Sequence, residues 1–355
     1  MAKYVKTEQG YKEYQEVEAA NSNKMDANNP VGTGSFSMGR KSGSQIGNNS
    51  HAEGYETTAS EPSSHAEGYY TTASGNSSHA EGDRTTASGT DSHAEGTSTT
   101  ASGSLSHAEG YYTTASGNSS HAEGNCTTAS GEVSHAEGSS TNKFSSVVNK
   151  VDPTNDDIIA AWKSKKFSLA KGSSSHVDGK DNLALGDGSH AEGNMTTASG
   201  DESHAEGRNT IASGLNAHAE GNSTTASNSN SHAEGFATTA SGFMSHAEGD
   251  NTTASGYASH VEGKYNVEDS QDKYVHIVGN GTYKVRSNAH TLDWNGVPWF
   301  KGRPQFGGTA QDQNSQTVIA NGDKEIILAS STAGSTKKFK ITIDDSGALS
   351  AIEII

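Results

Sequence analysis

The chain has 355 residues, of which only 30% are hydrophobic, with 41 glycines and a formal net charge of −17 at pH 7. A compact globule of this length carries nearer half apolar residues, so the composition excludes a conventional large core. The negative charge disfavours nucleic acid as a partner, and no run of 18 apolar residues is present to insert into a membrane. The single cysteine, Cys126, excludes an internal disulfide framework.

Residues 1–30 are polar and lack the apolar segment of a secretory signal peptide. We interpret them as an N-terminal attachment segment that docks on another protein. With no disulfide framework and no signal, we expect the protein to be made and assembled in the cytoplasm of the producing cell.

The next stretch repeats one 14-residue unit, H-A-E-G-x-x-T-T-A-S-G-x-x-S, in two blocks of seven. Two glycines per unit disfavour a helix, whereas two short strands and two turns fit its length. Successive units would then stack as coils of a parallel β-solenoid at about 4.8 Å per coil. We predict β-roll blocks at residues 31–140, which include a degenerate first coil, and at residues 168–265.

Strand alternation places the repeated histidine and its acidic partner on one face, with Ser and Ala on the other. In the degenerate coil, Phe36 and Met38 take the His and Glu places and form an apolar cap coil. Large apolar groups there indicate that this face is a buried seam between chains. The predicted seam consists of His51, Glu53, His65, Glu67, His79, Glu81, His93, Glu95, His107, Glu109, His121, Glu123, His135, Glu137, His176, Asp178, His190, Glu192, His204, Glu206, His218, Glu220, His232, Glu234, His246, Glu248, His260 and Glu262.

Three chemistries suit this His-x-Glu pattern. A Ser-His-Glu triad is disfavoured because adjacent residues such as Ser50 and His51 point to opposite strand faces. Histidines that meet at a seam between chains could bind zinc or nickel, but a divalent ion every ~4.8 Å would be strongly repelled by its neighbours. We favour an interchain hydrogen-bond ladder of imidazole and carboxylate, with no catalysis, metal or cofactor. Acid should loosen such a ladder.

The two blocks are separated by an insertion at residues 141–167. Thr154 and Asp157 have the spacing of a capping box, and Ile158, Ile159 and Trp162 follow at helical spacing. We therefore predict a short helix that docks on the solenoid and braces the break. The alternative is a protruding binding element.

Aromatic residues in the outward-facing turns could contact a receptor, for example by stacking on sugar rings, although scattered surface aromatics are ordinary. The candidate receptor contacts are Tyr69, Tyr70, Tyr111, Tyr112 and Trp162.

After the last repeat, residues 266–308 are predicted to form a connector and residues 309–355 a C-terminal β-strand cap. Within the cap, the alternating residues 338–343 predict a strand, and "DDSG" predicts a turn.

The unit resembles the head repeats of YadA-like trimeric adhesins, whose word reads roughly S-V-A-I-G. That resemblance implies a left-handed β-roll in a homotrimer, with the His and Glu places facing the trimer axis. The phrase "SNAHTLDWNG…WF.G" resembles connectors of phage and prophage tail fibres. Together they favour a trimeric tail-fibre or receptor-binding protein of a virion. Its partners would be a baseplate or upstream fibre protein and a bacterial surface receptor. The alternative is a YadA-like cell-surface adhesin.

Overall fold

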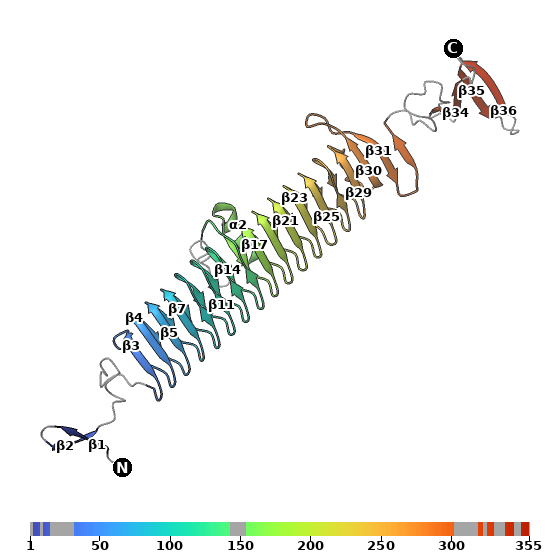
Figure 1. Cartoon of the computed structure of the whole chain (residues 1–355). Helices are drawn as coiled ribbons and strands as arrows, with labels where there is room; N and C mark the ends of the chain where they lie inside the picture. The colour runs from blue at the N-terminus through green and yellow to red at the C-terminus, as the bar shows by residue number, and fades with distance from the viewer. Residues whose placement is uncertain are drawn as a thin grey trace.

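The computed structural model describes residues 3–7, 10–14, 32–142 and 154–301, and the strands at 319–321, 325–329, 338–343 and 349–354. Residues 32–142 and 154–301 form an elongated shaft of stacked coils with one helix on its side (Figure 1). The predicted class is therefore confirmed: an all-β solenoid with one short helical insertion and a small C-terminal sheet. The left-handed sense of the coil stays a prediction.

Each coil contributes one strand to each of two parallel sheets. The first sheet carries the repeated histidines, and like residues of successive coils pair, as His107 does with His93 and His121. Its strands are β3 (Phe36–Arg40), β4 (His51–Ala59), β5 (His65–Tyr69), β7 (His79–Asp83), β9 (His93–Ala94), β11 (His107–Ala108), β13 (His121–Ala122), β15 (His135–Ala136), β17 (His176–Lys180), β19 (His190–Asn194), β21 (His204–Arg208), β23 (His218–Asn222), β25 (His232–Phe236), β27 (His246–Ala247) and β29 (His260–Lys264).

The second sheet carries the Thr-Ala pairs, and it includes the C-terminal part of β4. Its other strands are β6 (Thr72–Ala73), β8 (Thr86–Ala87), β10 (Thr100–Ala101), β12 (Thr114–Ala115), β14 (Thr127–Ala129), β16 (Ser168–Ala170), β18 (Leu183–Ala184), β20 (Thr197–Ala198), β22 (Ile211–Ala212), β24 (Thr225–Ala226), β26 (Thr239–Ala240) and β28 (Thr253–Ala254).

The interior of each coil is narrow because only small side chains fill it. Ala94 and Ala101 are fully buried, and Ser92 and Thr99 lie beside them at 1% and 0% exposure. The Ser92 hydroxyl donates to the Gly89 carbonyl at 2.7 Å and closes the turn before the histidine. Buried methyl groups and a coil-to-coil backbone ladder therefore hold the shaft together, without large apolar side chains in most coils.

The shaft ends in an antiparallel meander of β30 (Tyr274–Asn280), β31 (Asn288–Asp293) and β32 (Pro298–Phe300). β30 still pairs in parallel with β29, and β31 and β32 then reverse direction. This meander, residues 274–300, is called the terminal sheet below.

Two small antiparallel sheets lie outside the shaft sequence. β1 (Lys3–Thr7) and β2 (Gly10–Tyr14) form a hairpin within the predicted attachment segment. β33 (Ile319–Asn321), β34 (Glu325–Ala329), β35 (Lys338–Ile343) and β36 (Leu349–Ile354) form the C-terminal sheet. The strand predicted at 338–343 is thus confirmed, whereas the "DDSG" turn lies outside the described residues.

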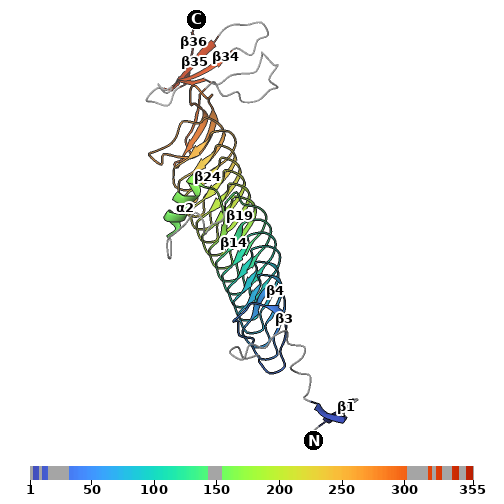
Figure 2. The same ribbon diagram turned by 90° about the vertical axis from the view of Figure 1, so that its left-hand side faces the viewer.

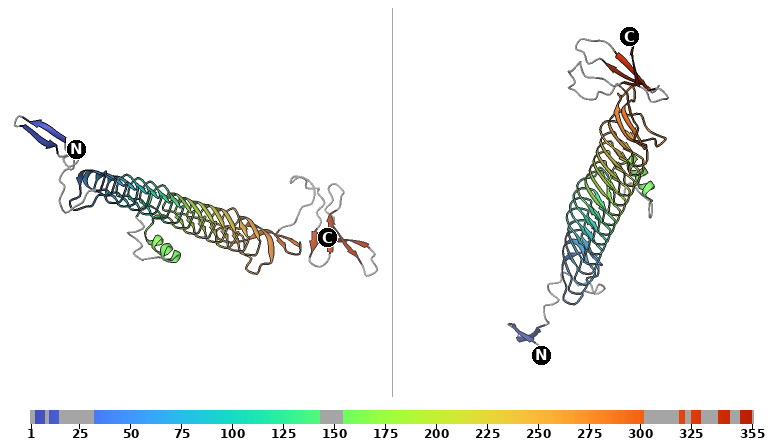
Figure 3. Two further views of the ribbon diagram at one scale, coloured as in Figure 1. Left: turned by 90° about the horizontal axis from the view of Figure 1, so that it is seen from below. Right: turned by 90° about the vertical axis from the view of Figure 1, so that its right-hand side faces the viewer.

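The insertion contains helix α2 (Asn155–Ser164), which stands on one side of the shaft (Figure 2; Figure 3, left). Its predicted capping box is present: Thr154 N donates to Asp157 Oδ2 at 3.0 Å, and Asp157 N donates to the Thr154 hydroxyl at 3.2 Å. Ile158 and Trp162 are buried against Leu169 and Leu183 of β16 and β18, together with Phe167 and Leu185. The helix therefore docks on the shaft, as the favoured interpretation predicted.

The prediction of Trp162 as a receptor contact is not compatible with this packing. Trp162 is only 8% exposed, its Nε1 donates to the Asp181 carbonyl at 3.0 Å, and Lys166 Nζ lies 3.0 Å from the ring centroid. The periodicity that makes a helix amphipathic turns its apolar stripe toward the core. Trp162 lies on that stripe, so its ring anchors the helix.

Candidate functional site

A single column of aromatic rings runs along the histidine-bearing face of the shaft. Between His65 and His260, neighbouring ring centroids are 4.5–4.9 Å apart and neighbouring planes are inclined by 1–13°. This spacing is the strand separation of a sheet, because each coil adds one ring at the same strand position. We call this set the ring column, and its members are Phe36, His51, His65, His79, His93, His107, His121, His135, His176, His190, His204, His218, His232, His246, His260, His276, His290 and Phe300.

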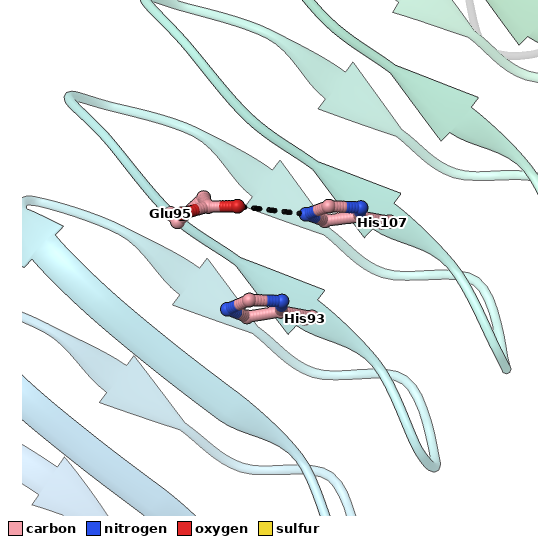
Figure 4. A group of neighbouring side chains, drawn as sticks. All are labelled: His93, Glu95 and His107. Atoms are coloured by element: carbon pink, nitrogen blue, oxygen red, sulfur yellow. Dashed lines mark hydrogen bonds and ion pairs between the residues drawn. The ribbon is translucent and has the colours of Figure 1, made fainter.

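Carboxylates border the ring column and pair with it in two ways. In some coils the partner is in the same strand, as in His51 and Glu53, where Nε2 and Oε2 are 3.2 Å apart. In others the carboxylate reaches the histidine of the next coil: His107 Nε2 donates to Glu95 Oε1 at 3.1 Å (Figure 4). The second mode ties consecutive coils together through their side chains.

The ring column is half-buried in the single chain. The side chains of His107 and Glu95 are 35% and 36% exposed, and the other pairs have similar values. Burial and the charge of neighbouring histidines lower the pKa of four column members, His65, His79, His190 and His232. Protonating one ring therefore disfavours protonation of the next.

The geometry at Ser50 and His51 does not form the Ser-His-Glu catalytic triad that the sequence pattern suggests. Ser50, which precedes His51, points into the coil, is 2% exposed, and donates its hydroxyl hydrogen to the Gly47 carbonyl at 2.6 Å. Such a serine is held by its own turn and lies on the opposite strand face from the imidazole. The repeated serine is therefore a structural residue.

Sets such as His93, Glu95 and His107 place one potential metal-ligating atom each within 4.8 Å of one another. The rings of His93 and His107 are, however, inclined by only 3°, with centroids 4.8 Å apart (Figure 4). A ligating lone pair lies in the ring plane and the Zn–N distance is about 2.0–2.1 Å, so parallel stacked rings do not converge on one ion. Within one chain, the partner of the His107 imidazole is the Glu95 carboxylate, at 3.1 Å.

The other predicted site residues lie at the ends and edges of the shaft. Phe36 and Met38 precede the first repeated histidine and are 41% and 43% exposed. Tyr69 and Tyr70 lie in an exposed turn edge with Tyr55, whose ring stacks on Tyr69 at 5.2 Å. Farther along the same edge, the Tyr111 and Tyr112 rings meet edge to face at 4.3 Å.

Sequence reasoning missed the C-terminal end of the ring column. The predicted seam ends at Glu262, and His276 and His290 fall in the predicted connector. The His276 ring nevertheless lies tilted against His260, with centroids 5.2 Å apart, and Glu262 lies 3.4 Å from its Nε2. His290 and Phe300 then continue the column on the antiparallel strands β31 and β32. The available signal was "HIVG", which keeps the His-x-x-Gly spacing of "HAEG" at residues 276–279.

The fold and the ring column together define a β-solenoid repeat protein with one continuous polar-aromatic face. The family model of the YadA head domain repeat (two copies) matches residues 66–92, 94–120, 108–132, 205–227 and 233–259. Both blocks of coils therefore contain YadA-like head repeats. No curated protein matches the chain.

Among the described residues, no helix is long and apolar enough to cross a membrane.

Proposed function

We propose that the protein is a homotrimeric attachment protein, an adhesin of the YadA-like type, whose three shafts meet along the ring column. The observation that carries this proposal is the column itself: one half-exposed face that has a histidine in every repeat and runs the length of the shaft. The matched YadA head repeats support the same assembly. In this proposal the His-Glu pairs form the interchain seam predicted from the sequence.

Exposed aromatic residues at both ends of the column support its burial in an assembly. Phe36 contacts His51 edge to face and Phe300 lies tilted against His290, and the two phenyl groups are 41% and 42% exposed in the single chain. Exposed phenyl groups on a face of otherwise half-buried rings gain free energy when a second surface covers them. Neighbouring chains related by threefold symmetry supply such a surface at every level.

The molar mass in solution tests the seam, because three chains of 36.7 kDa give about 110 kDa. We expect a trimer at neutral pH, and we expect the double variant His107→Asp and His121→Asp to dissociate at a lower urea concentration. Matched controls are Thr90→Asp and Ser104→Asp, which add the same charge on exposed turns. A monomeric parent protein, or equal loss of the trimer in the control, contradicts the proposal.

The attachment role is tested separately with the tyrosine edge, the turn residues Tyr55, Tyr69, Tyr70, Tyr111 and Tyr112, of which all but the half-buried Tyr112 are exposed. Replacing Tyr69 and Tyr70 by alanine should reduce adhesion of protein-coated beads to target cells without changing the molar mass. Replacing Ser77 and Leu105, which lie in other turns, by alanine provides the control. If the tyrosine variant adheres as well as the parent protein, the tyrosine edge does not contact the receptor.

A second candidate is a receptor-binding tail fibre of a phage or prophage particle, assembled in the host cytoplasm and carried on the virion. The feature that favours it is the phrase at residues 287–300, "SNAHTLDWNGVPWF", which forms β31 and β32. Its partners would be a baseplate or upstream fibre protein and a bacterial surface receptor, protein or glycan. Immunogold labelling distinguishes the two candidates: gold on particle tails supports the fibre, and gold on the producing cell's surface supports the adhesin.

A further inference from the structure

A pocket of about 660 Å³ lies between the last coil and the terminal sheet. Three cationic side chains line it, those of Lys273, Arg286 and Lys301, together with the aromatic rings of Tyr274 and Trp299. This volume is in the range of pockets that bind small molecules, about 300–1,000 Å³. Neither the seam nor the tyrosine edge uses these residues.

The pocket opens on the opposite face of the terminal sheet from the ring column. His290 pairs with Phe300, and the next pair, Thr291 with Trp299, consists of their direct chain neighbours. Successive side chains of a strand point to opposite faces. Thr291 and Trp299 therefore face the pocket while His290 and Phe300 continue the ring column, and chains joined along the column would leave the pocket open.

The charge of the pocket is opposite to that of the chain. Its one acidic residue, Asp293, accepts hydrogen bonds from the backbone amides of Asn295 and Val297 at 2.9 and 2.7 Å. Within the described part of the chain, no carboxylate forms an ion pair with Lys273, Arg286 or Lys301. In a chain of net charge −17, these cations mark a local site for an anion.

The three cations differ in how many hydrogen bonds they already make within the protein. Arg286 Nη1 donates to the carbonyls of Asn251 and Asn266, at 3.0 and 3.1 Å, and so braces the last coil. Lys301 Nζ donates to the Ser287 hydroxyl. Lys273 Nζ lies 5.0 Å from the centroid of the Tyr274 ring, and its charge is the one most available to a ligand.

Thr291 is distinguished by its place in the pocket lining. It is 2% exposed, yet its Oγ1 has no hydrogen-bond partner among the described residues. The repeat threonines that likewise lack a hydrogen-bond partner, such as Thr99, lie inside the coils and do not line this pocket. Buried hydroxyl groups in proteins are almost always paired, because an unpaired one loses its hydrogen bonds to water. A ligand with polar groups would supply the missing partner.

We propose that this pocket binds an acidic saccharide, a sugar ring that carries a carboxylate. The exposed face of Trp299 offers a stacking surface for the sugar ring, Lys273 and Lys301 offer charge to the carboxylate, and Thr291 Oγ1 offers a hydrogen bond to a ring hydroxyl. The assignment of such a sugar to a cell surface rests on the proposed attachment function. Binding of the free sugar does not.

Calorimetric titration of the full chain with sodium glucuronate tests the proposal, with glucose and sodium acetate as comparison ligands. We expect glucuronate to bind and to bind more tightly than either comparison ligand, because only glucuronate has both ring and charge. If acetate binds as tightly as glucuronate, the pocket does not recognise the sugar ring. If glucose binds as tightly as glucuronate, the charge does not contribute to binding. If glucuronate does not bind, the pocket is not a site for acidic saccharides.

Two variants locate the binding in the pocket. Lys273→Met should weaken glucuronate about tenfold, the effect of one charge-assisted hydrogen bond, whereas Lys284→Met on the exposed β30–β31 loop should leave the affinity unchanged. Thr291→Val should weaken binding without lowering the melting temperature, since Oγ1 has no partner among the residues that the structure describes. Unchanged affinity in both pocket variants overturns the proposal. Molar mass measured on the same samples reports on the trimer separately.

Discussion

The glycine at the fourth position of each unit is required for two reasons, its backbone conformation and its close contact with the next coil. Gly96 has φ +101°, a conformation that side-chain-bearing residues rarely adopt, and an added Cβ would lie 2.3 Å from the Gly110 carbonyl oxygen. Gly96→Ala should therefore destabilise the shaft by roughly 3 kcal/mol, in the upper part of the range for single substitutions. Thermal unfolding followed by circular dichroism measures the loss.

Gly43 provides the control for the steric term. Its φ is +82°, but an added Cβ would meet nothing within 4 Å. Gly43→Ala should destabilise by about 1–2 kcal/mol, the free energy of a left-handed conformation alone. If the two alanine variants lose equal stability, contact between coils does not account for this glycine.

The histidines make the stability of the protein depend on pH. The pKa of His65, His79, His190 and His232 is lowered in the folded protein, chiefly by burial and then by neighbouring histidines. The unfolded chain consequently binds more protons around pH 6, so stability falls as the pH decreases through the ordinary histidine value of about 6.5. We expect the melting temperature to decrease from pH 7.5 to pH 5.5.

Glu123 contributes in the same direction at lower pH. Burial opposes the shift, but the hydrogen bond with His135 and the charges of nearby histidines give a net lowering of the pKa of Glu123. Its contribution is lost as the pH falls below the ordinary glutamate value. His79→Asn should flatten the dependence between pH 7.5 and 5.5, and a melting temperature that rises on acidification would contradict this account of the ring column.

At the scale of the element, the docking of α2 depends on one side chain. Trp162→Ala removes a buried ring and the hydrogen bond to the Asp181 carbonyl, a change that in protein cores is worth about 3–5 kcal/mol. Because each coil contacts mainly its neighbours, we expect the loss to stay local. Hydrogen exchange should accelerate in residues 155–164 and hardly change in residues 190–260.

Trp162→Phe separates the two contributions of that side chain. It keeps most of the apolar contact with Leu169 and Leu183 and loses the hydrogen bond, which is worth about 1 kcal/mol. Its exchange rates should be intermediate. Acceleration spread evenly over the whole shaft would show that the helix stabilises more than the break it covers.

The features that could be predicted are those that depend on the repeated spacing in the sequence. The 14-residue period fixes the strands, and alternation fixes which side chains face inward, because both depend only on local spacing. The pairing of Glu95 with His107 could not be predicted, since it depends on the axial offset of adjacent coils. His276 and His290 were missed because the spacing changes to 16 residues and the chain then reverses direction. Trp162 was misassigned because helical spacing marks an apolar stripe without showing what it packs on.

At the scale of the whole molecule, the number of repeats sets the length of the shaft, and coils can be removed without changing the structure of those that remain. Coils interact mainly with their neighbours, so four complete coils, residues 79–134, can be removed while Ser78 still precedes a histidine, His135. The shortened protein should fold and assemble with the same number of chains, so its molar mass should fall only by the mass of the deleted residues. It should be shorter by about 19 Å, at about 4.8 Å per coil. Electron microscopy and light scattering measure both quantities.

Deletion of residues 79–127 removes three and a half coils instead and joins Ser78 to Thr128. The following threonine strand would then occupy a histidine level, and the ring column would be interrupted while the composition hardly changes. If the ring column is the seam, this variant should lose the assembly that the four-coil deletion keeps. Equal assembly of the two variants would mean that the register of the rings is not what joins the chains.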